Sequence, residues 1–214
     1  MKAELIKRLS KLPPAALYEA AESCRVLRSV FWPVTRANNF AGAAFTVFCS
    51  GDSNLAIHTA LYSAKPGDVL TIATGADCEC AFLGQLIVEA AALVGLGGIV
   101  IDGRVRDLEA LKKSELPVFC RGHAVQGPSK QRLGRDSIQK PIEIGDTLIR
   151  PGDFICGDRD GIVVLPGKPA QDIAAAAEYR MGNETRILGA LRNSRDPLYK
   201  LLGIDLGSWK DEAR

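Results

Sequence analysis

The sequence has little of what nucleic-acid-binding proteins and zinc-binding proteins depend on. Aromatic residues make up 6% of the 214 residues, only two histidines occur, and the net charge is +2. Acidic and basic residues are interspersed, so no long basic run supports nucleic-acid binding. Six cysteines are present without a paired C-x2-C knuckle, and Cys78-x-Cys80 has only the distant His58 or His123 to complete a zinc site. We therefore expect reduced thiols, with Cys78 and Cys80 as small buried residues.

Long hydrophobic runs are also missing. The longest apolar run, Ala90 to Ile101, is interrupted by glycines and is much shorter than the roughly 20 residues of a membrane-spanning helix. The N-terminal segment MKAELIKRLSKLPP carries scattered charges and lacks the apolar core of a secretion signal. These absences predict a cytoplasmic protein without a membrane segment. The remaining composition, 47% hydrophobic and 24% charged, is typical of one globular domain.

One stretch, GQLIVEAAALVGLGGIVIDGRVRDLE from Gly84 to Glu109, organises the chain. It predicts a helix over about Leu86 to Leu96, a turn at Gly97-Gly98, and a short strand over Ile99 to Ile101 that ends through Gly103. A strand without polar alternation is typical of an α/β layer fold, in which both faces of the sheet are covered. Whatever follows such a strand is held firmly.

The two ends of that stretch can bind an anion and a metal together. A helix N-terminus at Gly84 to Ile87 offers unpaired N–H groups, and Arg106 offers a bidentate fork for the same anion. Asp107 offers an oxygen ligand for Mg²⁺ or Mn²⁺. A carboxylate beside a divalent metal points to a 2-oxo acid. An alternative stays open, in which Arg106 and Asp107 form a pair that caps the next helix.

Three further polar residues have two interpretations each. Asn54 ends a turn and precedes a helix that runs to about Ser63, so it could simply cap that helix. His58 lies one helical turn later on the same face and is either an ordinary helix residue or a pocket residue. Lys130 lies in the long polar loop Gly122 to Gly134, where it is either solvated or in contact with an anionic substrate.

The remaining segments of the sequence predict helices and strands. Leu5, Leu9 and Leu12 share one helical stripe, and Pro13-Pro14 could open a second helix over Ala15 to Ser23. Further segments are predicted as a strand at 42–49, a strand at 69–73 with a polar loop at 74–77 that can reach the same pocket, a helix at 108–113, a strand at 117–120, β segments at 140–144, 147–149, 153–156 and 161–165, and a long helix at 169–192. The late β segments are interpreted as a β-rich cap on an α/β core.

An ordered set of short motifs resembles a known family. The motifs are GQLI at 84–87, GIVIDG at 98–103, VRD at 105–107, GAAFTV at 42–47, PGDVL at 66–70, PGD at 151–153 and DGIVV at 160–164. Together they are similar to the family that joins class II 4-hydroxy-4-methyl-2-oxoglutarate aldolases to the RraA regulators. The resemblance implies an RraA-like swivelling β/β/α fold, layered α-β-β-α. It would be a single domain over residues 1–214, with a core at about 40–166, N-terminal helices and a C-terminal helical tail.

The aldolase side of that resemblance implies a chemistry and an assembly. It implies cleavage of 4-hydroxy-2-oxo acids to release pyruvate, with Mg²⁺ or Mn²⁺ bound at Asp107 and oxaloacetate decarboxylation as a side activity. Arg106 would share the enolate charge, while Gly84, Gln85, Leu86 and Ile87 would bind the substrate together with Asn54. It also implies a homotrimer or homohexamer in which a glutamate of the C-terminal helix, best matched by Glu184, reaches a neighbour's site. A solvated helix face is the alternative for Glu184.

One departure from the family matters. Where the family has an acidic residue, this chain has Gln85, which cannot take a proton at neutral pH. The departure favours the alternative of a non-enzymatic RraA-like regulator that binds a protein partner of the RNA-degradation machinery. The long C-terminal helix favours the aldolase. A methyltransferase is disfavoured because no glycine-rich cofactor loop follows a first strand.

Overall fold

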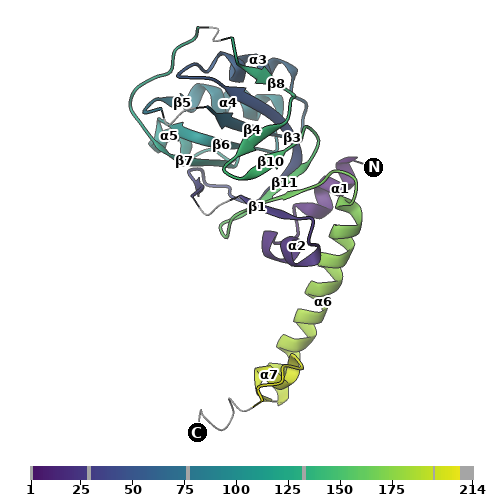
Figure 1. Cartoon of the computed structure of the whole chain (residues 1–214). Coiled ribbons are helices and arrows are strands. Elements are labelled where there is room, and N and C mark those ends of the chain that lie inside the picture. Colours follow the sequence, from purple (N-terminus) through teal and green to yellow (C-terminus); the bar gives the residue numbers. More distant parts are fainter. Residues whose placement is uncertain (1, 28–29, 76–77, 132–133, 195, 208–214) are drawn as a thin grey trace.

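The computed structural model describes residues 2–27, 30–75, 78–131, 134–194 and 196–207, and within them one large sheet carries the fold (Figure 1). The helices are α1 Lys2–Leu9, α2 Pro14–Ala20, α3 Leu55–Ser63, α4 Gln85–Val94, α5 Leu108–Leu111, α6 Ala170–Ser194 and α7 Leu198–Leu201. The strands are β1 Arg25–Leu27, β2 Trp32–Pro33, β3 Phe40–Cys49, β4 Asp68–Thr74, β5 Ala81–Leu83, β6 Gly98–Val105, β7 Val118–His123, β8 Ser137–Ile138, β9 Ile142–Ile144, β10 Thr147–Ile149, β11 Phe154–Gly157 and β12 Ile162–Leu165. The mixed α/β class is confirmed.

The middle of the sheet is parallel and its edges are antiparallel. The strand order is β1-β12-β11-β3-β4-β6-β7-β2, with β5 paired to β6 and β8 paired to β3. Strands β3, β4, β6 and β7 run parallel to one another, whereas β11 runs antiparallel to β3. The carboxyl ends of the parallel strands therefore meet at one edge, which is where α/β folds place their ligands.

Strand β6 is covered on both faces, as its uninterrupted apolar sequence predicts. Ile99 and Ile101 pack in one hydrophobic cluster with residues of α3 and α4, while Val100 packs in another with the β9–β10 hairpin. All three side chains are fully buried. Burial of each contributes about 1.5–3 kcal/mol relative to exposure, so the strand is a firm support for the residues that follow it.

Two boundaries in the central stretch differ from the prediction. Helix α4 ends at Val94, earlier than the predicted Leu96, because Gly95 adopts a left-handed conformation with φ of 80° and closes the helix. Strand β6 does not leave the sheet at Gly103 but continues to Val105, because its second half pairs with β5 and β7 after a register shift. The strand thus delivers Arg106 and Asp107 directly from the sheet.

Of the four late β segments that were interpreted as a cap, the last two belong to the main sheet and only the first two stand apart from it. Strand β11 pairs along the first half of β3, and β12 pairs with β11, so both extend the main sheet. Only β9 and β10 form a separate two-stranded hairpin among the described residues. Ile142, Ile144 and Ile149 of that hairpin pack in the cluster that also contains Ala44 and Val100. Strands that join the sheet pair with strands about a hundred residues away in the sequence. Local sequence patterns do not predict such pairing.

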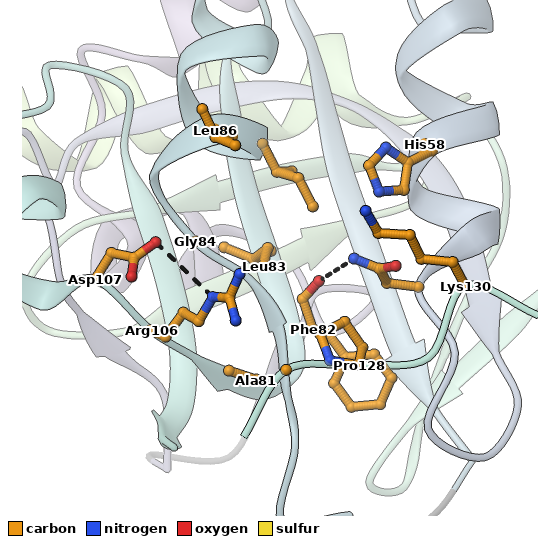
Figure 2. A pocket seen from close by; sticks show the side chains of 13 residues that line it. His58, Ala81, Phe82, Leu83, Gly84, Leu86, Arg106, Asp107, Pro128 and Lys130 are labelled. Carbon is orange, nitrogen blue, oxygen red and sulfur yellow. Dashed lines mark hydrogen bonds and ion pairs between the residues drawn. The ribbon is translucent and has the colours of Figure 1, made fainter. Parts of the chain in front are cut away.

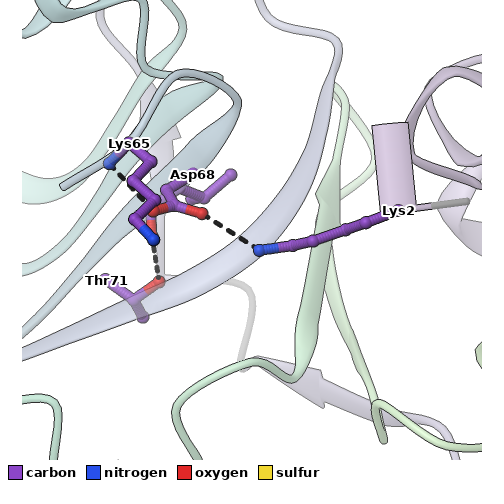
Figure 3. Close-up of polar contacts among 5 residues, drawn as sticks. Lys2, Lys65, Asp68 and Thr71 are labelled. Atoms are coloured by element: carbon purple, nitrogen blue, oxygen red, sulfur yellow. Dashed lines mark hydrogen bonds and ion pairs between the residues drawn. The ribbon is translucent and has the colours of Figure 1, made fainter. Parts of the chain in front are cut away.

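The N-terminal helix is attached to the sheet by a buried carboxylate. Asp68 at the start of β4 accepts hydrogen bonds from the Lys65 backbone N–H at 3.0 Å and from the Lys2 Nζ at 3.3 Å (Figure 3). The Asp68 side chain is largely buried, whereas that of Lys2 is mostly exposed. The pair therefore ties the first residue of α1 to the turn that precedes a central strand.

Helix α6 is anchored by its first half and projects from the body of the protein with its second half (Figure 1). Ala170, Ile173, Ala174 and Ala177 are buried against α1, α2 and the sheet. Arg8 pairs with Glu178 at 2.9 Å, but such exposed pairs contribute only about 0–1 kcal/mol, so packing holds the helix. The helix runs unbroken through Gly182 and Gly189. Within the described residues, no helix combines the length and apolar character needed to cross a membrane.

Candidate active site

A pocket of about 170 Å³ lies beside the N-terminus of α4 and brings five segments together (Figure 2). Its lining comes from the start of α3, from β5, from the first residues around α4, from the end of β6 and from the loop after β7. The residues are Asn54, His58, Ala81, Phe82, Leu83, Gly84, Leu86, Ile87, Arg106, Asp107, Gly127, Pro128 and Lys130. The pocket is small and suits a ligand of a few carbon atoms.

Asp107 is held at one end of the pocket by the helix it faces. Its Oδ2 accepts a hydrogen bond from the Gln85 backbone N–H at 3.0 Å. The carboxylate therefore lies at the N-terminal, positive end of the α4 dipole. Asp107 also occupies the cap position of α5, with φ of 63°, but its side chain makes no cap hydrogen bond there. The alternative in which Asp107 caps the following helix is thus correct for the position, because Asp107 is the N-cap residue of α5, but its carboxylate bonds to the first residue of α4 and not to α5.

Gly84 is required by this arrangement. A Cβ at Gly84 would lie 2.3 Å from Asp107 Oδ2 and 2.9 Å from Arg106 Cγ, both far inside normal contact distances. Any side chain at this position would push the carboxylate or the arginine away. The glycine of the GQLI motif thus serves close approach between the helix N-terminus and the arginine-aspartate pair.

Arg106 lies between the helix N-terminus and the loop after β7. Its backbone N–H donates to the Leu83 carbonyl at 3.0 Å, which fixes the turn, and its Nε lies 3.9 Å from Asp107 Oδ2. A Cβ at Gly127 would lie 2.8 Å from Arg106 Nη1, so the bare backbone of that loop makes room for the guanidinium. The side chain is half-exposed. Arg106 therefore keeps donors available for an anion in the pocket.

The first turn of α4 keeps two open donors. The Gln85 N–H is taken by Asp107, whereas the Leu86 and Ile87 N–H groups have no acceptor among the described residues. Both residues line the pocket. Unpaired amides at a helix N-terminus are a ready site for a carboxylate or phosphate. The side chain of Gln85 is exposed and does not line the pocket.

The side chain of Asn54 belongs to the pocket and does not cap α3. The residue is 3% exposed, and its Nδ2 donates to the Phe82 carbonyl at 2.8 Å. Asn54 is the N-cap residue of α3, as predicted, but its side chain makes no cap hydrogen bond there. Its Oδ1 is buried and has no partner in the described residues. A buried acceptor without a donor carries a cost of about 1–3 kcal/mol, which a ligand donor would relieve.

His58 and Lys130 lie together at the end of the pocket opposite Arg106 and Asp107 (Figure 2). The pKa of His58 is lowered from its ordinary value, first by burial and second by the positive charge of Lys130. His58 is therefore neutral at pH 7, and Lys130 supplies the charge at this end. For both residues the structure favours the pocket interpretation over the ordinary surface one.

Glu184 does not reach the pocket of its own chain. It lies on the projecting part of α6, where its Oε1 is 3.5 Å from the Arg180 Nε in an exposed pair. Arg180 also pairs with Glu19 of α2. The role that the family implies for Glu184 in a neighbouring subunit stays a prediction.

The polar loop at 74–77 was expected at the same pocket. Its described residues, Thr74 and Gly75, instead line a separate hollow with Asp102 and Arg104, and residues 76 and 77 lie outside the described residues.

Sequence reasoning also missed β5, whose residues Ala81 to Leu83 line the pocket. The apolar triplet directly before the GQLI motif was the available signal for that strand.

The residues that line the pocket suit a divalent cation that is bound weakly and keeps most of its water ligands. Asp107 is the one carboxylate that lines it, and no group of three or more His, Cys, Asp or Glu residues within the described ranges could enclose a metal. Mg²⁺ commonly uses one or two carboxylates together with water and substrate oxygens. A site completed by the substrate is therefore compatible with this pocket, whereas a closed structural metal site is not.

Comparison with known proteins agrees with the motifs. The family model described as RraA-like, Aldolase/RraA, matches residues 15–164. A curated relative from Halalkalibacterium halodurans, named "Putative 4-hydroxy-4-methyl-2-oxoglutarate aldolase", is 33% identical over 181 residues, covering 85% of each chain. RraAS2 of Streptomyces coelicolor, described as an unusual member of the RNase ES inhibitor RraA protein family, has a TM-score of 0.73, 26% identity and coverage of 86% of this chain and 96% of that one.

A second solved structure of an RraA protein is also similar to this chain. The RNA-processing inhibitor RraA from Thermus thermophilis has a TM-score of 0.67 and 25% identity, and the match covers 72% of this chain and 93% of that one. The family match spans the sheet, the pocket and the arginine-aspartate turn. The resemblance read from the ordered motifs is thereby confirmed, and the chain belongs to the RraA-like, Aldolase/RraA family.

Proposed function

We propose that this protein is a divalent-metal-dependent class II aldolase that cleaves 4-hydroxy-2-oxo acids of the 4-hydroxy-4-methyl-2-oxoglutarate type and releases pyruvate. Oxaloacetate decarboxylation would be a second reaction of the same pocket. One observation carries the proposal: the open amides of Leu86 and Ile87 face a pocket that also holds Arg106 and Asp107. The aldolase name of the curated relative supports the same reaction class.

The pocket has one end for the pyruvate portion of the substrate. The 1-carboxylate would accept hydrogen bonds from the Leu86 and Ile87 N–H groups at the positive end of the α4 dipole. The guanidinium of Arg106 would lie beside the 2-oxo group. A divalent cation bound at Asp107 would supply Lewis-acid polarisation of that group. Asp107 is already oriented for this by its hydrogen bond to Gln85.

The other end fits the remainder of the substrate. The unpartnered Oδ1 of Asn54 can accept a hydrogen bond from a substrate hydroxyl, and Lys130 can pair with a second carboxylate. Because Lys130 lies at this end, away from Arg106, we expect it to meet the distal carboxylate and not the 2-oxo carbon (Figure 2). Schiff-base chemistry at Lys130 is therefore disfavoured.

In the cleavage step, a base removes the proton of the 4-hydroxyl, the bond between C3 and C4 breaks, and its electrons move into the pyruvate portion. Arg106 would stabilise the enolate charge that develops there. A proton then returns to C3 to complete pyruvate. Gln85 cannot be the base, since its amide does not take a proton at neutral pH. We propose that Glu184 of a neighbouring subunit acts at this step.

The direct test is a pyruvate-release assay with a panel of 4-hydroxy-2-oxo acids and oxaloacetate, each with and without Mg²⁺ or Mn²⁺. We expect release that depends on protein and metal together and that stops when a chelator is added. Oxaloacetate must be compared with the metal-only background, because free metal ions also decarboxylate it. Conversion that is equal with and without metal, or no conversion above that background, would contradict the aldolase.

We further propose a homotrimer or a dimer of trimers. The projecting part of α6 and the following segment expose apolar side chains that have no cover in a single chain, among them Leu188, Leu198, Leu202 and Ile204.

Light scattering should give three or six times the chain mass of 22.9 kDa. Truncation after Gly182 keeps the buried part of α6 and should reduce assembly and activity, while Glu184→Gln should reduce activity alone. A monomeric full-length protein would remove Glu184 from the site.

A second candidate function is a non-enzymatic regulator that binds a protein partner. Gln85, in place of the family's acidic residue, favours it, and the RraA names of two similar structures agree with it. The pyruvate assay separates the two candidates. A regulator would show no release with any substrate, although its pocket would be intact.

A further inference from the structure

Two thiols lie next to one another immediately before β5. Cys78 Sγ and Cys80 Sγ are 2.6 Å apart, and the Cys80 backbone N–H points at Cys78 Sγ from 3.2 Å. The sequence predicted two small buried residues. Cys80 is indeed fully buried, but Cys78 is partly exposed and lines an open hollow of about 450 Å³. One sulfur of the pair is therefore accessible from solvent, while the other is shielded.

We propose that Cys78 and Cys80 form a reversible dithiol–disulfide site whose oxidation is coupled to the pocket through β5. A zinc site is not an alternative here, because no third His, Cys, Asp or Glu joins the two thiols within the described residues. The thiol chemistry does not depend on the proposed aldolase activity. It would hold equally if the protein were a regulator.

Hydrogen peroxide is the chemical class of oxidant that we invoke. The Cys78 thiolate attacks one peroxide oxygen and becomes a sulfenic acid, and hydroxide leaves. The Cys80 sulfur then attacks the Cys78 sulfur, the disulfide bond forms, and water leaves. In total two thiols are oxidised, one peroxide is reduced and two waters are produced. A dithiol reductant reverses the change by exchange.

The partial exposure of Cys78 distinguishes this pair from the other cysteines, which are all buried. Burial raises the pKa of Cys80, and the neighbouring Cys78 thiol adds to the effect, so Cys80 remains a thiol until it meets an oxidised partner. Burial also raises the pKa of Cys49 to about 12 and that of Cys120 to about 11. Buried thiols of this kind are inert, whereas oxidation selects accessible sulfurs that have a resolving cysteine nearby.

The two cysteines are connected to the pocket through the backbone of β5. Cys80 directly precedes Ala81, whose N–H donates to the Gln126 carbonyl at 2.8 Å and so joins β5 to the loop that contains Gly127 and Pro128. A disulfide across the single residue Glu79 closes a small ring, and strained disulfides are the labile, easily reduced ones. A covalent bond of about 2.05 Å between the two sulfurs closes a ring that contains the backbone of residues 78–80, so the constraint acts on the segment that enters β5.

The test treats the full-length protein with hydrogen peroxide and analyses, without reduction, the peptide that contains residues 78–80. We expect that peptide to lose the mass of two hydrogen atoms and to regain it with dithiothreitol. Cys78→Ser and Cys80→Ser should each abolish the loss, whereas Cys120→Ser, which removes a buried thiol elsewhere, should leave it unchanged. If Cys80→Ser does not fold, Cys78→Ser decides alone, since Cys78 is partly exposed.

Several outcomes would overturn the inference. These are a Cys78 that proceeds to sulfinic or sulfonic acid, a disulfide to any other cysteine, or a peptide that stays reduced under conditions that oxidise a free dithiol peptide of the same sequence. Amide hydrogen exchange provides the second measurement. Exchange at Ala81 to Leu83 should increase in the oxidised form, and unchanged exchange in a fully oxidised sample would overturn the coupling to the pocket.

Discussion

Replacement of Asp107 by alanine should reduce metal-dependent pyruvate release to the level seen with chelator. Asp107 is the one carboxylate that lines the pocket among the described residues, and its Oδ2 is directed by the Gln85 N–H. Without it, the residues that line the pocket offer no anionic oxygen to a cation. We expect a loss of about 10²–10³-fold, comparable to the removal of a principal electrostatic group from an active site. Steady-state assays over a range of Mg²⁺ and Mn²⁺ concentrations would measure it.

Asp107→Asn is the matched control, because its amide oxygen can still accept from the Gln85 N–H but carries no charge. Loss of the helix cap in Asp107→Ala should cost about 0.5–2 kcal/mol of stability. For a chain of this length each kcal/mol corresponds to roughly 2–4 °C in Tm. Asp107→Asn should therefore keep most of the Tm and lose the activity. Activity retained in Asp107→Asn would show that the carboxylate acts as a cap and not as a metal ligand.

The parts of this site that the sequence predicted are those determined locally. The apolar run of β6 predicts a strand buried on both faces, and the glycine-led turn before α4 predicts a helix start. The ordered motifs then place Arg106 and Asp107 at the end of that strand. Each of these inferences depends on residues within one stretch, so that neighbouring side chains and backbone conformation suffice to establish it.

The parts that the sequence could not predict depend on long-range contacts. Asp107 looked like a cap of the helix that follows it, but its carboxylate finds the N–H of Gln85, 22 residues earlier. Asn54 looked like a cap of α3, but its amide bonds to Phe82, 28 residues later. Both residues had a local partner available, and the fold offered a better one. Such competition between near and distant partners is decided by tertiary packing.

The exchange Gln85→Asp should tighten Mg²⁺ or Mn²⁺ binding. Residue 85 is the first residue of α4, and its exposed side chain starts at the same helix end as the Asp107 carboxylate. A carboxylate in the first turn is favoured by the helix dipole. Because the side chain at position 85 is exposed, its attraction to a cation at Asp107 is screened by solvent and is worth about 0.2–1 kcal/mol, which is at most about fivefold in affinity. Isothermal titration with Mn²⁺ would measure the change without any turnover.

Gln85→Asn is the control for this exchange, because it shortens the side chain as aspartate does but adds no charge. It should leave the metal affinity unchanged. Gln85→Asp should also raise the retro-aldol rate more than the decarboxylation rate, because only the aldol cleavage requires a proton to leave a hydroxyl. An affinity for Mn²⁺ that is unchanged or weaker in Gln85→Asp would refute the electrostatic argument. Tighter binding with an unchanged aldolase rate would mean that another group, such as Glu184 of a neighbouring subunit, already removes that proton.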